Sequence, residues 1–387
     1  MPRGKGKPSA KAKSTPSRAR KAFAAASSTE GEAAAALGTG GQDKGPELEI
    51  TTSRQFESWL AERNITLAFT TYQAGKLFFV GLNRDNRLAI FNRTLERCMG
   101  LAYAANSLWV AGLYQIYKFV DVMAGQAASR EGYDALFVPQ AAYYTGDLDT
   151  HDLGVGRDGR LYFVNTLFSC IASLSDTHSF KPVWRPSFVD RLAAEDRCHL
   201  NGMALNRGVP VIATAAAETN IADGWRDHRD TGGVVIDVKS GKSIITGLSM
   251  PHSPRIYRNA LWLHNSGTGH FGRADLDKGT FEPLAFCPGY LRGLDFVDGH
   301  AIVGLSKPRK DKTFGGLALD DNLAREKVEA RCGLYVIDLA SGDIVHWLRL
   351  EGMIEELYDV AVLPGRRNTA AIGFRTDEIR RVISIET

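Results

Sequence analysis

The feature that most restricts the fold of this 387-residue chain is a repeat. Each copy is a short apolar strand, a turn and a second strand rich in β-forming residues. Seven copies recur at spacings of about 30 to 67 residues, a period typical of arrays of similar structural units. The copies begin at Thr66, Met99, Leu153, Asn201, Pro254, Arg292 and Asp359.

A second pattern follows several copies: a strand that ends in Asp, a turn that contains Gly, and another strand. Ser-Gly and Lys-Gly turns supply the positive φ that tight hairpins need. Two hairpins per repeat make four antiparallel strands, which is one propeller blade. The predicted fold class is therefore all-β, a single β-propeller of seven blades, with six as the alternative. The second pattern is clearest at 234–245, 272–283 and 335–347.

Segments outside the repeats also carry structural signals. Residues 48–52 precede the first copy and are predicted to pair with the last blade, which would remove open sheet edges. Residues 53–63 and part of 315–330 predict short helices. The literal GxGxxG match at 154–159 is followed by a strand, not a helix, so it predicts a hairpin turn and no nucleotide cofactor. Trp225 and four other tryptophans are expected to pack between blades.

Charge divides the chain into two parts. Residues 1–45 hold nine Lys/Arg and three acidic residues, a charge of +6, which leaves about −3 of the total +3 for residues 46–387. We interpret 1–45 as a disordered basic Ala/Ser-rich tail, with an organelle transit peptide as the alternative reading, and 46–387 as the propeller domain. A mildly acidic body predicts no binding of nucleic acid by the folded part.

Cysteine usage and hydropathy favour a cytoplasmic protein. The five cysteines are scattered, odd in number and without a CxxC pair, which fits a reducing compartment. No apolar stretch approaches the length of a membrane span, and the start of the sequence lacks the apolar core of a secretory signal. The oligomeric state is not indicated.

Candidate functional residues follow from the repeat. The inner strand of every blade lines the axial channel of a propeller, so residues at one offset converge. Three of the nine histidines fall at this offset in consecutive copies, which predicts a metal site for Zn, Fe, Mn or Cu. A pocket without metal and histidines with a structural role are the alternatives. Residues at the matched position are Arg97, His151, His199, His252, Tyr290 and Glu356.

Other residues near this offset complete a hypothetical site. His151, His199 and His252 are the predicted metal ligands. Glu356, with Asp359 as an alternative, could be a fourth ligand or a general base, and Asp152 is the other catalytic candidate, beside His151 together with Asp149. The residues predicted to bind substrate are Arg97, Arg255, Arg292, Tyr290 and Asn201.

At these motifs the sequence resembles an uncharacterised bacterial family of conserved hypothetical proteins, a domain of unknown function. The resemblance covers about residues 48–386 and implies a propeller-like fold without an established activity. The repeats are more loosely similar to gluconolactonase-type and NHL-type propellers, whose lactonase sites use Glu, Asn and Asp around Ca²⁺, where this chain offers histidines. The motifs are TTYQAGKL (70–77), YYTGDLDTHDLG (143–154), CHLNGMA (198–204), MPHSPR (250–255), GLSKPR (304–309), RCGLYVIDLASG (331–342) and ELYDVAVLPG (356–365).

Two functions remain open from the sequence. The first is a metal-dependent enzyme with a small polar, peptide or saccharide substrate. The alternative is a non-catalytic scaffold that binds a protein or ligand partner, for which the basic run at 307–312 is a candidate contact.

Overall fold

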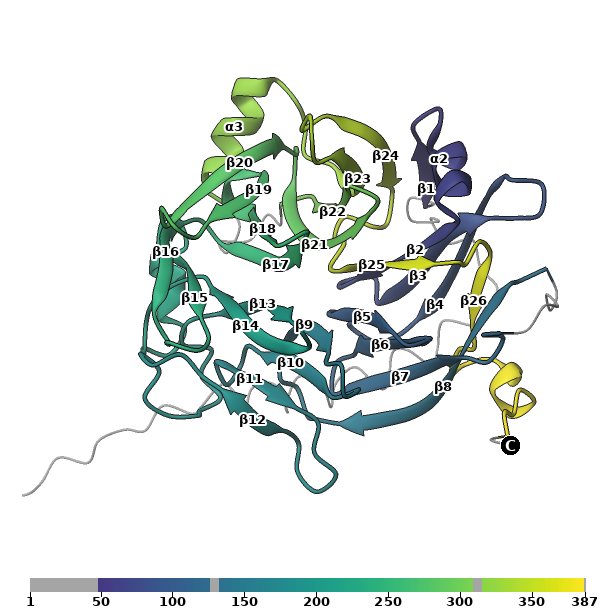
Figure 1. Ribbon diagram of the computed structural model, residues 1–387, viewed down its shortest axis with the longest axis horizontal. Coiled ribbons are helices and arrows are strands. Elements are labelled where there is room, and N and C mark those ends of the chain that lie inside the picture. Colours follow the sequence, from purple (N-terminus) through teal and green to yellow (C-terminus); the bar gives the residue numbers. More distant parts are fainter. Residues whose placement is uncertain (1–47, 126–131, 309–314, 386–387) are drawn as a thin grey trace, which may run out of the picture. The chain divides into compact units, whose positions relative to one another are not determined.

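A computed structural model describes residues 48–125, 132–308 and 315–385. These residues form six antiparallel-rich sheets that stand around a common axis (Figure 1). The predicted disordered tail, residues 1–45, lies outside the described residues. In the described ranges, the two α-helices have eight and nine residues, and no helix is long and apolar enough to span a membrane.

We number the sheets as blades 1 to 6 and name their strands from the axis outward. Blade 1 contains β25 (Val360–Pro364), β2 (Ile65–Thr71), β3 (Lys76–Leu82) and β4 (Leu88–Thr94). Blade 2 contains β5 (Leu101–Ala104), β6 (Ser107–Ala111), β7 (Gln115–Asp121), β8 (Ala135–Tyr144) and β26 (Thr369–Ala371). Blade 3 contains β9 (Thr150–Val155), β10 (Leu161–Asn165), β11 (Cys170–Ser173) and β12 (Lys181–Trp184).

The other three blades follow the same plan. Blade 4 contains β13 (Leu200–Asn206), β14 (Val209–Ala215), β15 (Gly233–Asp237) and β16 (Ser243–Leu248). Blade 5 contains β17 (Pro251–Tyr257), β18 (Ala260–Asn265), β19 (His270–Asp275) and β20 (Thr280–Phe286). Blade 6 contains β21 (Tyr290–Val297), β22 (His300–Ser306), β23 (Cys332–Asp338), β24 (Ile344–Glu351) and β1 (Glu49–Thr52).

The propeller prediction is confirmed. The predicted count of seven blades is wrong for the described residues, which form six blades, the number given as the alternative. The copies that begin at Thr66 and Asp359 are not two blades. Strand β25 from the last copy pairs antiparallel with β2 from the first copy, from Ile65↔Pro364 to Phe69↔Val360. Two sequence repeats at opposite ends of the chain therefore share one sheet, and this pairing closes the ring.

Both ends of the propeller are held by pairing with distant strands. Strand β1 pairs with β24 of blade 6, so residues 48–52 form the predicted closing strand, but on the blade of the Arg292 copy and not on the last copy. Strand β26 adds a parallel edge strand to β8 of blade 2. The predicted helices are α2 (Phe56–Arg63) and α3 (Ala318–Glu326). The GxGxxG segment is the turn between β9 and β10, with Gly159 at φ 77°.

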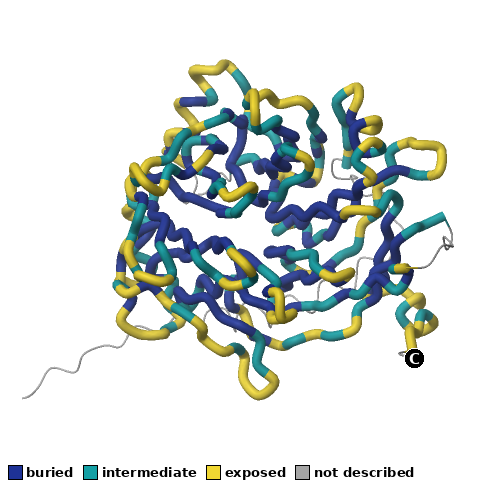
Figure 2. Tube along the Cα trace, viewed as in Figure 1, coloured by how far each residue is buried: buried dark blue, intermediate teal, exposed yellow. Residues whose placement is uncertain are grey.

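Apolar side chains fill the spaces between neighbouring sheets, and exposure is concentrated in the loops and outer strands (Figure 2). The seam between blades 1 and 2 illustrates this, because Phe79 and Phe137 stack with ring centroids 5.7 Å apart and are both fully buried. Burial of one such side chain contributes about 1.5–3 kcal/mol. The helix α2 adds Phe56, Trp59 and Leu60 to the core beside blade 6.

Polar seams join the inner parts of neighbouring blades. At four seams a hydroxyl near the end of the second strand donates to a backbone carbonyl of the next blade's inner strand or of the segment that leads into it. Buried hydroxyls and carbonyls need such partners, so this repeated bond fixes how adjacent blades meet. The bonds are Thr70 to Met99 O (2.6 Å), Thr166 to Leu200 O (2.6 Å), Ser266 to Leu291 O (2.7 Å) and Ser306 to Leu357 O (2.7 Å).

Aspartates in three blades make a second kind of seam. Each carboxylate accepts a hydrogen bond from a backbone N–H of the next inner strand. The pairs are Asp152 with Met203 N (2.9 Å), Asp295 with Val362 N (2.7 Å) and Asp359 with Leu101 N (2.8 Å).

Arg255 of blade 5 links two of these aspartates across the axis. Its guanidinium makes a bidentate pair with Asp152 of blade 3, at 2.8 and 2.9 Å, and lies 3.8 Å from Asp359. Burial raises the pKa of Asp359 to about 8, against the opposing effect of Arg255. One guanidinium therefore ties blades 3 and 5 together and faces blade 1.

Removal of the Arg255 guanidinium should destabilise the propeller. Arg255→Met leaves the buried Asp152 carboxylate without its counter-charge, and we expect a loss of about 3 kcal/mol in the free energy of unfolding. Denaturant unfolding measures it. The exposed pair of Arg273 with Glu282 supplies the control, because Arg273→Met should change stability little. Equal losses in the two variants would contradict the role given to Arg255.

Stability should also depend on pH through Asp359. Its folded-state pKa is raised, so the folded protein binds a proton that the unfolded chain has released above pH 4. The free energy of unfolding should therefore fall as pH rises from about 4 to about 8. Asp359→Asn should flatten this slope, whereas the exposed Asp230→Asn should not. Unfolding by urea at several pH values tests this, and an unchanged slope in Asp359→Asn would contradict it.

Candidate metal centre

Three histidines gather around the propeller axis at the end where the inner strands begin, which we call the mouth. His151 is the second residue of β9 and His252 is the second residue of β17. Two residues before each of them, Asp149 and Met250 have φ of 54° and 48°. This left-handed turn aims the Asp149 and Met250 carbonyls at the imidazoles, and each accepts a 2.9 Å hydrogen bond from Nδ1.

His199 reaches the same place by a different route. It lies just before β13 with φ 49°, outside the strand, so the predicted common offset holds for His151 and His252 but not for His199 in detail. Its Nδ1 is 3.0 Å from the Asp196 carboxylate, and the same oxygen accepts the Trp225 indole N–H at 2.9 Å. The Trp225 ring stacks on the imidazole, with centroids 4.1 Å apart.

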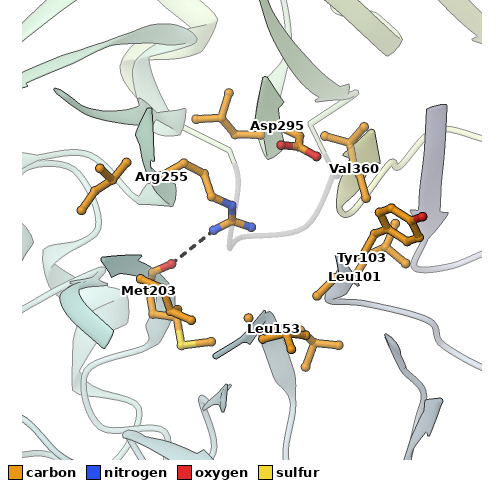
Figure 3. A pocket seen from close by; sticks show the side chains of 14 residues that line it. Leu101, Tyr103, Leu153, Met203, Arg255, Asp295 and Val360 are labelled. Atoms are coloured by element: carbon orange, nitrogen blue, oxygen red, sulfur yellow. Dashed lines mark hydrogen bonds between the residues drawn. The ribbon is translucent and has the colours of Figure 1, made fainter. Parts of the chain in front are cut away.

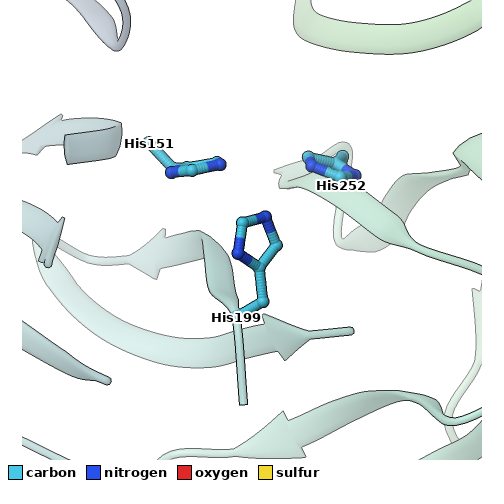
Figure 4. A group of neighbouring side chains, drawn as sticks. All are labelled: His151, His199 and His252. Atoms are coloured by element: carbon cyan, nitrogen blue, oxygen red, sulfur yellow. The ribbon is translucent and has the colours of Figure 1, made fainter. Parts of the chain in front are cut away.

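These contacts determine which nitrogen of each ring is available. A backbone carbonyl only accepts, so Nδ1 of His151 and His252 must carry the hydrogen and Nε2 keeps a lone pair. A carboxylate partner selects the same tautomer for His199. One ring nitrogen from each histidine lies within 4.8 Å of the others, and the rings turn toward a common point (Figure 4). A tetrahedral metal would draw them to about 3.4 Å.

Burial keeps two of the imidazoles neutral. It lowers the pKa of His151 well below its usual value, with His199 and Arg292 adding to the effect, and it does the same for His252 with the help of Arg292. Neutral imidazole is the form that binds metals. The Nε2 atom of His252 is buried, and no described residue offers it a hydrogen bond. The residue type, tautomer and placement therefore fit a metal ion.

The other half of the mouth is lined by an arginine and tyrosines. Tyr290 meets the His252 ring at 5.5 Å between centroids, and Tyr358 meets the His151 ring at 5.5 Å. The Arg292 guanidinium lies over both phenols, 5.5 Å from Tyr290 and 4.5 Å from Tyr358. Tyr290 and Arg292 therefore lie beside the histidines, and their role in substrate binding stays a prediction.

Three further candidates lie around this mouth in other roles. Glu356 is buried and pairs with Arg292 at 3.3 Å, and it is not part of the group of ligand atoms formed by the histidines. Asn201 accepts a hydrogen bond from Thr214 at 2.8 Å, while its amide nitrogen has no partner among the described residues. Arg97 makes ion pairs with Asp147 at 2.6 Å and Asp149 at 3.2 Å.

Asp152 and Arg255 are not placed with the histidines. Arg255 points into a cavity of about 220 Å³ near the other end of the inner strands, which is lined mainly by residues with apolar side chains (Figure 3). The Asp152 carboxylate is held by Arg255 and Met203 N, so it does not orient His151. Successive side chains of a strand point to opposite faces, which explains why neighbours in sequence serve different sites. The His151 ring is instead oriented by the Asp149 carbonyl.

Four residues of the site were missed as site residues by the sequence analysis. Asp196 and Trp225 support His199, and Trp225 had been assigned to packing between blades. Thr166 lies 2.8 Å from His151 Nδ1, and because its hydroxyl donates to Leu200 O, it accepts from the imidazole. Tyr358 precedes an inner strand. Only Asp196, three residues before His199, had a signal in the local sequence.

Comparison with known proteins gives a family but no activity. The family described as "Domain of unknown function (DUF4915)" matches residues 54–372, most of the chain. The chain belongs to this family. The resemblance to an uncharacterised family implied a propeller-like fold, and the structure of this chain has that fold. No curated protein matches the sequence.

Solved structures of similar arrangement are propeller-type proteins. A nidogen/laminin complex aligns with 12% identity over 78% of this chain and 99% of that chain, with a TM-score of 0.48. A protein of unknown function from Bacteroides caccae aligns with 12% identity over 78% and 99%, at 0.45. A gluconolactonase-family protein aligns with 11% identity over 72% and 92%, also at 0.45. The function must therefore be argued from the side chains of this chain.

The Asp196 carboxylate should stabilise the apoprotein. Asp196→Ala leaves the N–H groups of His199 and Trp225 without their acceptor, so we expect a loss of about 1–3 kcal/mol and increased exposure of Trp225. Thermal unfolding and tryptophan fluorescence measure both effects. Asp227, exposed in the same 3₁₀ segment as Trp225, is the matched control. A melting temperature equal to that of Asp227→Ala would contradict the assigned contacts.

Proposed function

We propose that this chain is a metal-dependent enzyme whose divalent metal is held by His151, His199 and His252 at the mouth of the axial channel. The observation that carries the proposal is the orientation of the three imidazoles. Each Nδ1 is engaged by a partner on the protein, and a ring nitrogen from each histidine faces a common point. Partners of this kind accompany metal-bound histidines and fix their tautomers.

The ligand set favours some metals over others. Three histidines with an open fourth position are a catalytic zinc ligand set. Imidazole also suits copper and iron, whereas manganese prefers carboxylate and carbonyl oxygens, which the group of ligand atoms does not include. Zn²⁺ is therefore the first ion to test. When bound, such an ion polarises a substrate oxygen and makes a bound water more acidic, which would support hydrolytic or lyase chemistry.

The residues around the triad have supporting roles in this proposal. The Asp149 and Met250 carbonyls and the Asp196 carboxylate hold the imidazoles in the metal-binding tautomer. The Arg292 guanidinium, together with its partner Glu356, shapes the opposite wall. Glu356, which pairs with Arg292, is the proposed general base, and its test is the pH dependence of any activity found.

Metal binding is tested on the purified full-length protein. We expect about one equivalent of Zn²⁺ by elemental analysis after loading and dialysis. His199→Ala should weaken binding by more than about 100-fold, because even changes in residues that orient a ligand cost 10- to 100-fold. His178→Ala, at an exposed histidine, is the control and should bind as the unaltered protein does. Absence of metal in a folded, loaded protein would overturn the proposal.

A scaffold function is the second candidate, and exposed apolar side chains on the loops of the histidine mouth favour it. Tyr144 is 71% exposed at the end of β8, Ile221 is 71% exposed between β14 and β15, and Met353 is 60% exposed before β25. A protein partner could cover them. The basic run at 307–312 lies in part outside the described residues. A scaffold predicts that His199→Ala keeps partner binding intact.

We also keep the cytoplasmic location as a proposal. All five cysteines are buried and unpaired, which fits a reducing compartment.

A further inference from the structure

The wall opposite the histidines is built around one guanidinium. Arg292 is 5% exposed and lies over two phenol rings, and each of these rings meets one of the histidines. Tyr290 comes from the start of β21 in blade 6, and Tyr358 comes from the segment just before β25 in blade 1. Two blades on one side of the channel therefore present a positive charge between aromatic rings toward the histidine triad on the other side.

The two arginines at this mouth already pair with three carboxylates before any ligand arrives. Arg292 pairs with Glu356 at 3.3 Å, and Arg97 at the rim pairs with Asp147 and Asp149. A divalent metal on three neutral imidazoles would add two positive charges in a buried place. Asp196 beside His199 and Asp149 beside His151 offset part of this charge, and an anionic ligand at the open metal position would offset more of it.

One hydrogen-bond donor in the wall has no acceptor. The Tyr358 hydroxyl is buried, and no described residue forms a hydrogen bond with it. The side chain is only 3% exposed and contacts both the His151 ring and the Arg292 guanidinium. A buried hydroxyl without a partner costs about 1–3 kcal/mol, and a ligand oxygen would remove this cost.

The charge expected on the bound anion follows from Arg292 and Tyr358. Phosphate sites commonly combine several cationic side chains with backbone N–H groups. Here one arginine, already paired with Glu356, stands beside two phenol rings, and the Tyr358 hydroxyl is the donor that the argument uses. A planar carboxylate matches a guanidinium fork and a single hydroxyl donor, and its single charge suits a wall with one partly neutralised cation.

We propose that the channel mouth binds a substrate through a carboxylate group, which lies between the metal on the histidine triad and the wall formed by Arg292 and Tyr358. This inference rests on the proposed metal centre and names the substrate class of the same site. Tyr358 donates a hydrogen bond to the carboxylate, and Arg292 supplies the facing charge.

The test uses Co²⁺, whose visible spectrum reports on its ligands, in the full-length protein. Acetate is the probe and is titrated into the Co²⁺-loaded protein, in parallel with inorganic phosphate and ethylamine. We expect a saturable spectral change with acetate, a weaker one with phosphate and none with ethylamine. Tyr358→Phe should bind Co²⁺ as the unaltered protein does but bind acetate roughly tenfold more weakly, the effect of one hydrogen bond to a charged group.

Two control variants separate the possible outcomes. Tyr103→Phe removes a hydroxyl from a residue that lines the cavity at the other end of the inner strands and should leave acetate binding unchanged. Arg292→Lys keeps the charge but loses the planar fork, so it should also weaken acetate binding. This variant takes the place of Tyr358→Phe if Tyr358→Phe does not fold.

The results distinguish this inference from the proposed function. No binding of Co²⁺ would overturn the metal centre and the inference with it. Stoichiometric Co²⁺ binding without a response to acetate, or with equal acetate affinity in Tyr358→Phe and the unaltered protein, would overturn the inference alone. Tighter binding of phosphate than of acetate would overturn the assignment to carboxylates.

Discussion

The ion pair between Arg255 and Asp152 is the interaction on which the arrangement of the inner strands depends. It joins blade 5 to blade 3 across the axis, and the same Asp152 carboxylate accepts the Met203 N–H of blade 4 between them. Because three inner strands meet at one carboxylate, their relative positions are fixed. His151 and His252 lie at the starts of two of these strands and His199 lies just before the third, so the pair joins the strands that carry the histidines.

The backbone conformation at the starts of the inner strands orients the histidines of the candidate site. Left-handed residues at Asp149 and Met250 direct carbonyls onto two imidazoles, and Thr166 binds both His151 and the next blade. The hydrogen bonds that join blades and those that orient the three histidines are thus partly the same bonds. In the proposed centre, a change at a seam should therefore affect stability and metal binding together. A change at Tyr358 should affect only the binding of the carboxylate ligand.

The sequence predicts the propeller and the three histidines because both follow from the repeat. The blade count was wrong because β25 and β2 are similar in sequence to inner and second strands of separate blades, while their pairing across 295 residues has no local signal. Arg255 was misplaced because side-chain direction changes at each residue and at bulges such as the one between His252 and Arg255. Tyr358 precedes Asp359 as His151 precedes Asp152, but the matched position in that copy had been assigned to Glu356. Trp225 contacts His199 only through tertiary packing, so no spacing could reveal it.

The central claim is that His151, His199 and His252 together bind one divalent metal. X-ray absorption at the zinc edge of the Zn²⁺-loaded full-length protein tests it most directly. We predict about three imidazole nitrogens at about 2.0–2.1 Å, with the outer-shell scattering typical of histidine rings. A spectrum dominated by oxygen ligands with no imidazole scattering, or by sulfur at about 2.3 Å, would contradict the account.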